Sequence, residues 1–188
     1  MSTTQPIRNA NHVRALTKYY LNKGEYRNYR LIVLSLHTAL RISDLLSLRW
    51  SDVYDFKQKR PLKEFSLTEK KTGKSKIVAI NRYVAAALKK DAANAAPQDF
   101  LFANPQTGKA LQRAQAYRII RAAGEGIGLR GRISCHSLRK TFGYFAWKKG
   151  ISPALIMEIY NHSSLSQTRR YLGINQDDMN TVYMGMTF

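Results

Sequence analysis

Two imidazoles, several guanidiniums and a phenol lie close together in the last third of the sequence. His136-Ser-Leu-Arg139 is followed by Asn161-His162 and then by Arg169-Arg170-Tyr171. An imidazole carries protons near neutral pH, a guanidinium binds two phosphate oxygens at once, and an activated phenol is a nucleophile. Together these residue types are typical of a site that transfers a phosphoryl group.

The spacing of these residues indicates how the chain must fold around them. His136 and Arg139 are three positions apart, so on one helix they project from the same face. His162 and Tyr171 are nine apart, about 900° of rotation on a straight helix, which places them on opposite faces. Ser164-Leu-Ser-Gln167 matches a capping box, so we expect a new helix to start there, with His162 in the preceding loop. That break lets both side chains reach one point.

The charge of the chain indicates a polyanionic partner. Its 188 residues include 31 Lys and Arg against 12 Asp and Glu, a formal net charge of +19. Self-repulsion of this size destabilises a compact chain, and nucleic acid relieves it. The longest mainly apolar run, residues 31–40, is too short and too polar to span a membrane. With no secretory signal, and a single cysteine that excludes an internal disulfide, we expect a cytoplasmic protein.

Hydrophobic periodicity predicts one mainly α-helical domain with a small antiparallel β-sheet inserted. Residues 29–40 are nearly all apolar and should form a central core helix. Alternating segments within residues 65–80 flank Lys71-Thr-Gly73, which predicts a β-hairpin or meander with lysines at its tip. The predicted helices cover residues 13–21, 29–40, 84–93, 111–123, 136–149, 153–160, 164–171 and 177–184.

Charged residues far upstream extend the candidate site. Arg41 directly follows the core segment, Asp44 lies three positions later where it can pair with Arg41, and Lys71 lies at the hairpin tip. Each residue alone has an ordinary explanation, such as a surface arginine, a solvated turn lysine, a capping histidine or a core tyrosine. The ordered set is improbable by chance: Arg41, Lys71, His136, Arg139, His162 and Tyr171.

This ordered set resembles the catalytic domain of the tyrosine recombinases, the lambda-integrase family, over residues 10–184. Residues 38–44 are similar to the first arginine box of the family, with Asp44 in place of the usual Glu. His136-Ser-Leu-Arg139 is similar to the second box, and Asn161-His162 replaces the usual Gly-His. Tyr171-Leu-Gly stands at the nucleophile position of the family.

The resemblance implies a mechanism on double-stranded DNA. Tyr171 would attack the scissile phosphate and form a 3′-phosphotyrosine, which frees a 5′-hydroxyl. Arg41 and Arg139 would clamp the non-bridging oxygens and stabilise the charge that develops on them. Arginine suits this role because its planar fork stays protonated and binds two oxygens.

The resemblance also implies the roles of the remaining residues. His136 would help to move the tyrosine proton, Lys71 would protonate the leaving 5′-oxygen, and His162 would donate a hydrogen bond to the phosphate. Asp44 would orient Arg41 from behind. No metal and no cofactor are expected, since the sequence has no evident carboxylate cluster.

The expected organisation has three parts: a flexible leader at residues 1–9, a catalytic domain at residues 10–175, and a C-terminal helix and tail at residues 176–188. The resemblance implies that this tail is exchanged between protomers in a homo-tetramer on DNA, and that the free protein is monomeric or weakly associated. Many relatives carry an additional N-terminal domain that clamps the duplex. The pattern here begins near Met1, as in the fimbrial-switch invertases or a trimmed chain.

Three functions fit these observations. The first is a site-specific recombinase, either an integrase or an invertase. The second is a type IB topoisomerase-like nicking–closing enzyme, which shares the chemistry without strand exchange. The third is a non-catalytic DNA-binding protein, and a ribosomal or chromatin-type binder has similar bulk charge. The helix expected at residues 177–184 favours the first function, and the intact residue set argues against the third.

Overall fold

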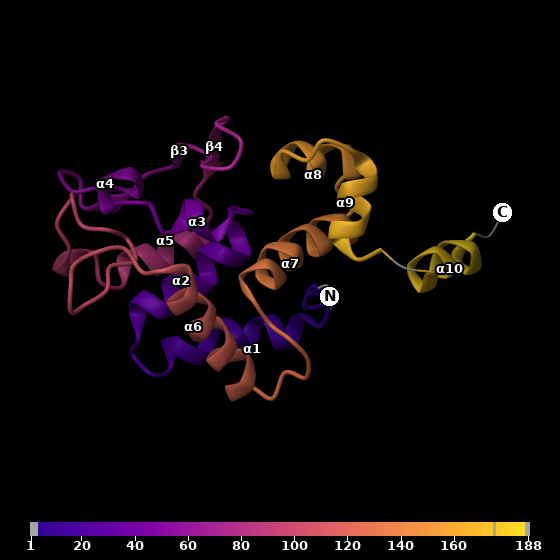
Figure 1. Ribbon diagram of the computed structural model, residues 1–188, viewed down its shortest axis with the longest axis horizontal. Coiled ribbons are helices and arrows are strands. Elements are labelled where there is room, and N and C mark those ends of the chain that lie inside the picture. The colour runs from indigo at the N-terminus through magenta and orange to yellow at the C-terminus, as the bar shows by residue number, and fades with distance from the viewer. Residues whose placement is uncertain (1–3, 175, 187–188) are drawn as a thin grey trace.

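The computed structural model of the protein describes residues 4–174 and 176–186. The described chain is mostly helical with small antiparallel sheets, as the sequence predicted, but it has two such sheets where one was expected. A body built around α2 occupies one side of the molecule, and α7 leads from it to α8 and α9 (Figure 1). The candidate site residues come from both parts, so the contact between these parts decides the geometry of the site.

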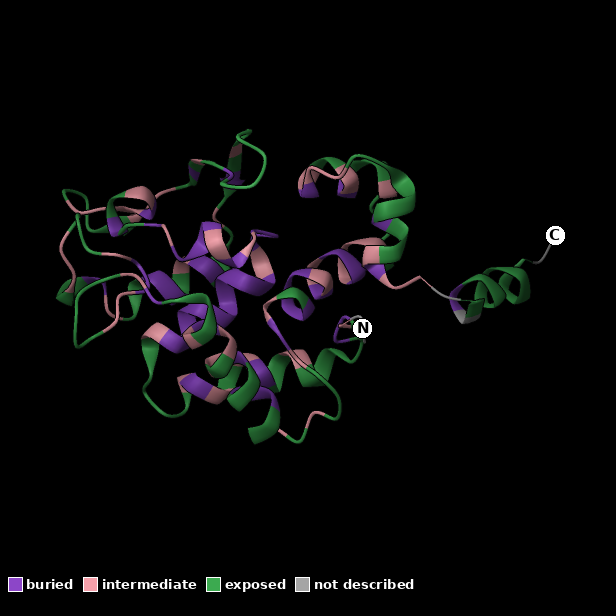
Figure 2. Ribbon diagram, viewed as in Figure 1, coloured by how far each residue is buried: buried purple, intermediate pink, exposed green. Residues whose placement is uncertain are grey.

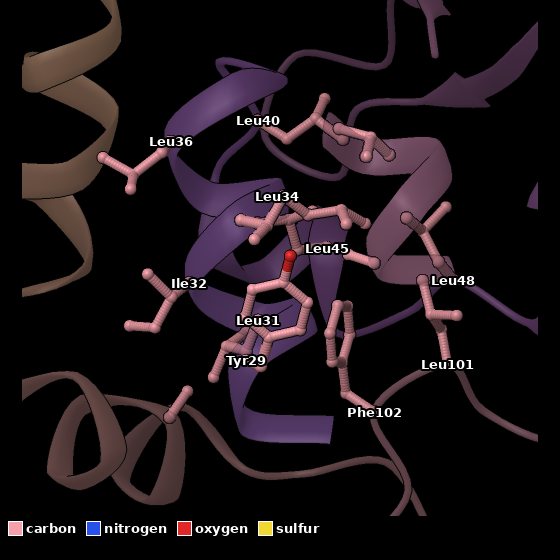
Figure 3. Packing of buried hydrophobic residues seen from close by; sticks show 14 of the residues in the cluster. Tyr29, Leu31, Ile32, Leu34, Leu36, Leu40, Leu45, Leu48, Leu101 and Phe102 are labelled. Carbon is pink, nitrogen blue, oxygen red and sulfur yellow. The ribbon is translucent and has the colours of Figure 1, made fainter. Parts of the chain in front are cut away.

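The centre of the body is α2 (Tyr26–His37), which packs against α1 (Ala10–Leu21), α5 (Arg82–Lys89) and α7 (Cys135–Lys148). Apolar side chains from α2 meet others from residues 40–48 and 101–102 in a continuous core (Figure 3). Full burial of one such side chain stabilises the fold by about 1.5–3 kcal/mol. This core holds α2 in place and so fixes the position at which the chain leaves the helix.

The end of α2 differs from the prediction and matters for the site. The helix ends at His37 rather than at Leu40. Thr38 follows as the C-cap, and its hydroxyl donates a hydrogen bond to the carbonyl of Leu34 at 2.7 Å. Ala39 follows with a φ of 55°, a left-handed conformation that is unusual for a residue with a side chain. The chain therefore turns sharply, and Arg41 emerges beside the next helix.

The hairpin predicted around Lys71 is present as β3 (Glu64–Thr68) and β4 (Ser75–Ala79). Phe65 pairs with Val78 in this hairpin and both are buried, so one face of the hairpin lies on the core. A second sheet, β1 (Tyr54–Asp55) with β2 (Arg60–Pro61), was not predicted, because strands of two residues are too short to show an alternating pattern.

The other elements of the body follow the prediction with shifted ends. Residues 42–53 form two short helices, α3 (Ile42–Leu45) and α4 (Trp50–Val53). The helix expected at residues 84–93 ends at Lys89, and a 3₁₀ turn, η1 (Ala92–Asn94), follows it. The helix expected at residues 111–123 is α6 (Arg113–Gly126), which continues three residues further.

Beyond α7 the chain forms α8 (Pro153–Tyr160) and α9 (Leu165–Leu172), which pack on α7. Gly150 has a φ of 83° just after the last residues of α7, as expected for a glycine that closes a helix. A second, smaller core lies here, formed by Ala39, Ile156, Tyr160 and Leu172. Because Ala39 comes from the end of α2, this small core joins the two parts of the molecule.

Residues 4–9, which belong to the expected leader, lie along α7 and contact it. Ile7 is buried, and its N–H donates to Thr141 Oγ1 at 2.8 Å. The guanidinium of Arg8 donates to the carbonyl of Gly173, just after α9. The periodicity of the sequence could not show this, because these contacts join residues more than a hundred positions apart. Residues 1–3 lie outside the described part of the chain.

The last described helix, α10 (Gln176–Gly185), extends away from α9. Figure 1 shows it beyond the rest of the molecule, and Figure 2 shows that it is mostly exposed. Near its start, Asp178 forms ion pairs with Arg8 at 3.7 Å and with Lys148 at 3.4 Å. No helix in the described ranges is long and apolar enough to cross a membrane.

Candidate active site

The turn between α8 and α9 places His162. Asn161 ends α8 in the left-handed conformation, with a φ of 52°. Ser164 then caps α9 by accepting the N–H of Gln167 at 3.2 Å, so the helix break expected at this serine is present. His162 lies in the loop between them, with Nδ1 3.0 Å from Thr168 Oγ1.

The charge state of His162 follows from its surroundings. Its Nδ1 pairs with Thr168 Oγ1, which also lies 3.3 Å from the carbonyl of Ser164. Burial, followed by the positive charges of Arg139 and Arg41, lowers the pKa of His162 to about 4. The imidazole is therefore neutral near pH 7, and an anion in the site would favour its protonation.

Tyr171 lies on α9, half-buried beside His162. Its ring centroid is 5.0 Å from that of His162 and 5.1 Å from that of Tyr160. Burial raises the pKa of Tyr171, and the charge of Arg139, a hydrogen bond from Arg139 and the charge of Arg41 oppose this rise. The phenol thus rests in the site of its own chain, next to two cations that stabilise its deprotonated form.

Arg139 is 3% exposed and is held from two directions. Its guanidinium donates to the carbonyl of Ala39 and, at 3.1 Å, to that of Tyr160. It also lies 4.7 Å from the ring centroid of Tyr160. A buried guanidinium is costly unless its N–H groups are paired, and these contacts satisfy part of that need. The left-handed Ala39 therefore contributes to the site, because its carbonyl helps to hold Arg139.

Arg41 is the N-cap residue of α3 and lies at the edge of the site. Its Nη1 is 2.7 Å from Oε2 of Glu69, a residue between β3 and the hairpin turn. The Arg41 side chain is 18% exposed, whereas that of Glu69 is fully buried. One edge of the guanidinium is therefore fixed by the protein while the group still reaches solvent, where a phosphate would approach.

Asp44 was expected to orient Arg41, but it contacts other groups. Asp44 is fully buried on α3, and its Oδ1 accepts the N–H of Lys70 at 3.1 Å. The carboxylate that pairs with Arg41 is that of Glu69. Asp44 thus holds the start of the hairpin turn, next to the lysine that was predicted to act.

Two hairpin lysines are candidates for the proton donor. Lys71, the predicted one, is exposed in the turn between β3 and β4. Lys76 instead points into the site, and its ammonium donates a hydrogen bond to the carbonyl of Ile159 at the end of α8. Burial lowers the pKa of Lys76 to about 8, and the charge of Arg139 acts in the same direction. The structure therefore brings Lys76 to the arginines and leaves Lys71 at the rim.

His136 is the second residue of α7 and is exposed. Partial desolvation, followed by the charges of Arg139 and Arg113, lowers its pKa. A neutral imidazole in such a cationic setting can accept a proton. In the described part of the chain, no group of His, Cys, Asp and Glu side chains could hold a metal ion.

Sequence reasoning missed Glu69, Lys76 and Asn161 as members of the site. Lys76 could have been found, because it lies two positions before the buried Val78 and so shares its core-facing side of the strand. Glu69 gave no such indication, and Asn161 was noted only as the residue in place of the usual Gly before His162. They meet across 92 positions of sequence, where Asn161 Nδ2 donates to Glu69 Oε2 at 2.9 Å.

Comparison with known proteins identifies the family. The sequence profile of the phage integrase family matches residues 8–177. The chain is 36% identical over 183 residues to the probable integrase/recombinase YoeC of Bacillus subtilis and covers 97% of both sequences. It is 32% identical to the type 1 fimbriae regulatory protein FimE of Escherichia coli K12, over 79% of this chain and 75% of that one.

Solved structures show the same fold. The XerA recombinase matches with a TM-score of 0.80 at 21% identity, over 99% of this chain and 68% of that one. A post-cleavage complex of the XerH site-specific recombinase with its difH substrate matches with a TM-score of 0.77 at 21% identity, over 97% of this chain and 53% of that one. The chain therefore belongs to the phage integrase family and has the fold of a tyrosine recombinase catalytic domain.

Proposed function

We propose that this chain is a site-specific DNA recombinase, an integrase or invertase, that cleaves and rejoins double-stranded DNA through a phosphotyrosine at Tyr171. The observation that carries the proposal is the meeting of Tyr171, Arg139 and His162 in one site of a chain with a net charge of +19. The names of the relatives support it, since YoeC is described as an integrase/recombinase. A DNA substrate also places the working enzyme in the cytoplasm.

In the proposed cleavage step, the Tyr171 oxygen forms a bond to phosphorus and the bond from phosphorus to the 5′-oxygen breaks. Arg41 and Arg139 neutralise the charge that builds on the non-bridging oxygens. The 5′-oxygen leaves with a proton from Lys71. In the joining step, a 5′-hydroxyl attacks the phosphotyrosine and Tyr171 leaves, so no external energy source is needed.

The proton of Tyr171 must leave before or during the attack. Both histidines have lowered pKa values and are neutral near pH 7, so each is able to accept it. We assign this role to His136 and the hydrogen bond to the phosphate to His162. His162 needs a proton on Nε2 for that bond, and the phosphate itself supplies the negative charge that favours the imidazolium.

We propose that the protein works as a homo-tetramer on DNA and is monomeric or weakly associated when free, with α10 exchanged between neighbouring protomers. Three apolar side chains on α10 are strongly exposed: Val182 is 62% exposed, Tyr183 76% and Met184 86%. A helix that stays in water rarely exposes such a group, and another protein surface would cover it. Arg8 and Lys148 hold only the start of this helix, at Asp178.

Covalent capture tests the proposed reaction without knowledge of the target sequence. Nicked duplexes prepared from a fragment library are incubated with the protein, so that the freed 5′-end diffuses away and the adduct accumulates. We expect a covalent protein–DNA adduct that survives denaturation and is absent with Tyr171→Phe. Absence of an adduct from the whole library would contradict the proposal.

A second measurement distinguishes strand exchange from nicking and closing. A captured fragment is placed twice in a supercoiled plasmid, and a plasmid without the fragment serves as the control. We expect deletion or inversion of the segment between the two copies. Relaxation of both plasmids at equal rates, without rearrangement, would instead identify a type IB topoisomerase-like enzyme.

A further inference from the structure

Glu69 is an acid buried near Arg41, Arg139 and Lys76 in a basic chain. It is fully buried, follows β3 directly and faces Arg41. A buried carboxylate costs several kcal/mol unless charged or polar donors surround it. Burial alone would raise the pKa of Glu69, but hydrogen bonds from Asn161, Thr72 and Arg41 outweigh it and leave the pKa below its usual range. Glu69 is therefore charged at neutral pH.

Three donor groups lie around one oxygen of this carboxylate. Glu69 Oε2 lies 2.7 Å from Arg41 Nη1, 2.8 Å from Thr72 Oγ1 and 2.9 Å from Asn161 Nδ2. The backbone of Glu69 also closes the hairpin turn, because its carbonyl accepts the N–H of Gly73 at 2.8 Å. The side chain and the main chain of Glu69 thus fix the same turn.

The three donors come from three separate parts of the chain. Arg41 directly precedes α3, Thr72 follows Lys71 in the hairpin turn, and Asn161 precedes His162 in the loop after α8. Figure 1 shows the hairpin and α8 facing each other across this region. Each donor is therefore a candidate catalytic residue or the direct neighbour of one.

We infer that Glu69 is a positioning residue of the strand-transfer reaction, which holds Arg41 toward the scissile phosphate and joins the segments that carry Lys71 and His162. This inference rests on the proposed function. Among the described residues, Glu69 is the partner that fixes the Arg41 guanidinium. With one nitrogen held, the other N–H groups keep a constant direction, which preorganises them for phosphate oxygens.

The charge of Glu69 gives this role a distinctive consequence. Replacing Glu69 by Gln removes a negative charge from a DNA-binding site, so DNA binding should tighten or stay unchanged. The same change weakens the hold on Arg41, because a neutral acceptor binds a guanidinium less strongly than a carboxylate does. Cleavage should therefore slow while binding does not weaken, whereas general damage to the fold would weaken both.

The experiment uses a nicked duplex that forms the wild-type adduct, and it measures the dissociation constant and the single-turnover cleavage rate at saturating DNA. For Glu69→Gln we expect unchanged or tighter binding and a cleavage rate at least ~10-fold lower, which corresponds to ~1.4 kcal/mol. Glu64→Gln is the matched control, because Glu64 is an exposed residue of the same strand and the charge change is identical. It should leave the cleavage rate unchanged.

A double-mutant cycle tests whether Glu69 acts through Arg41. In an Arg41→Lys background, Glu69→Gln should cost much less than it does alone, because its target is already lost. Full additivity would show a purely structural role and overturn the inference. A Glu69→Gln rate equal to or above wild type would also overturn it, since the carboxylate would then be idle or in competition with the phosphate. A wild-type protein that forms no adduct refutes the proposed function instead.

Discussion

Substituting Gly143 by Ala tests whether the packing of α7 against α8 and α9 sets the position of Tyr171. A Cβ at this position would lie 2.5 Å from Tyr160 Oη and 2.6 Å from Leu172 Cδ2. Carbon atoms in normal contact are about 3.5–4.0 Å apart, so the neighbours must move by about 1 Å. Tyr160 and Leu172 are both fully buried, and neither can turn away into solvent.

The expected cost combines three terms. Overpacking costs about 1–3 kcal/mol, and loss of the 2.6 Å hydrogen bond from the Tyr160 hydroxyl to the Arg139 carbonyl costs about 1 kcal/mol. The higher helix propensity of Ala returns about 1 kcal/mol. The net destabilisation is therefore about 1–3 kcal/mol, and each kcal/mol lowers the melting temperature by about 2–4 °C in a domain of this size.

The effect on cleavage should exceed the effect on stability. Leu172 directly follows Tyr171, so a shift of α9 moves the nucleophile by a similar distance, and a 1 Å misplacement can cost about 100-fold in rate. We would measure thermal unfolding and the single-turnover cleavage rate of folded protein, with Gly124→Ala in α6 as the control. The nearest contact of a Cβ there is 3.3 Å. Wild-type melting and wild-type cleavage for Gly143→Ala would refute the reasoning.

Three further predictions concern charge. We expect Lys71→Ala to regain cleavage on a substrate with a 5′-sulfur leaving group, because a thiol of pKa about 8.5 leaves without a proton donor. Lys76→Met should not regain cleavage on that substrate, because it loses the contact with Ile159. The pKa of His162 is about 4 in the folded protein and about 6.5 when unfolded. The unfolded state therefore binds protons first, and stability should fall as the pH drops from about 6.5 to about 4. His162→Gln should make this decline in melting temperature shallower. Each phosphate neutralised should add about 0.9 to the negative log–log salt slope of DNA binding, and a slope near zero would contradict the electrostatic argument.

Much of the fold could be predicted from the sequence because the strongest patterns are local. The helix starting after Ser164 follows from a capping motif, and the end of α7 follows from Gly150. The premature end of α2 could not be predicted. Apolar residues continue to Leu40, and the left-handed turn at Ala39 is imposed by packing against α7, α8 and α9.

The site residues also fall into those that local sequence patterns predicted and those that they did not. Motif spacing indicated Arg41, Arg139 and Tyr171, because the resemblance depends on the order of a few residues along the chain. The contact between Glu69 and Asn161 has no local sequence pattern, because it forms only when the hairpin and the α8–α9 loop come together. The expected partnership of Arg41 with Asp44 assumed that neighbours in sequence pair, whereas a more distant carboxylate occupies that place.

The position of residues 4–9 has a practical consequence for anything attached to this protein. Thr4 accepts a hydrogen bond from Lys140 at 2.6 Å, and the Lys140 ammonium lies 5.3 Å from the ring centroid of Tyr171. A tag or fusion partner attached ahead of Met1 would therefore be tethered through residues 1–3 to a point beside the nucleophile. We expect its size and charge to compete with the duplex there.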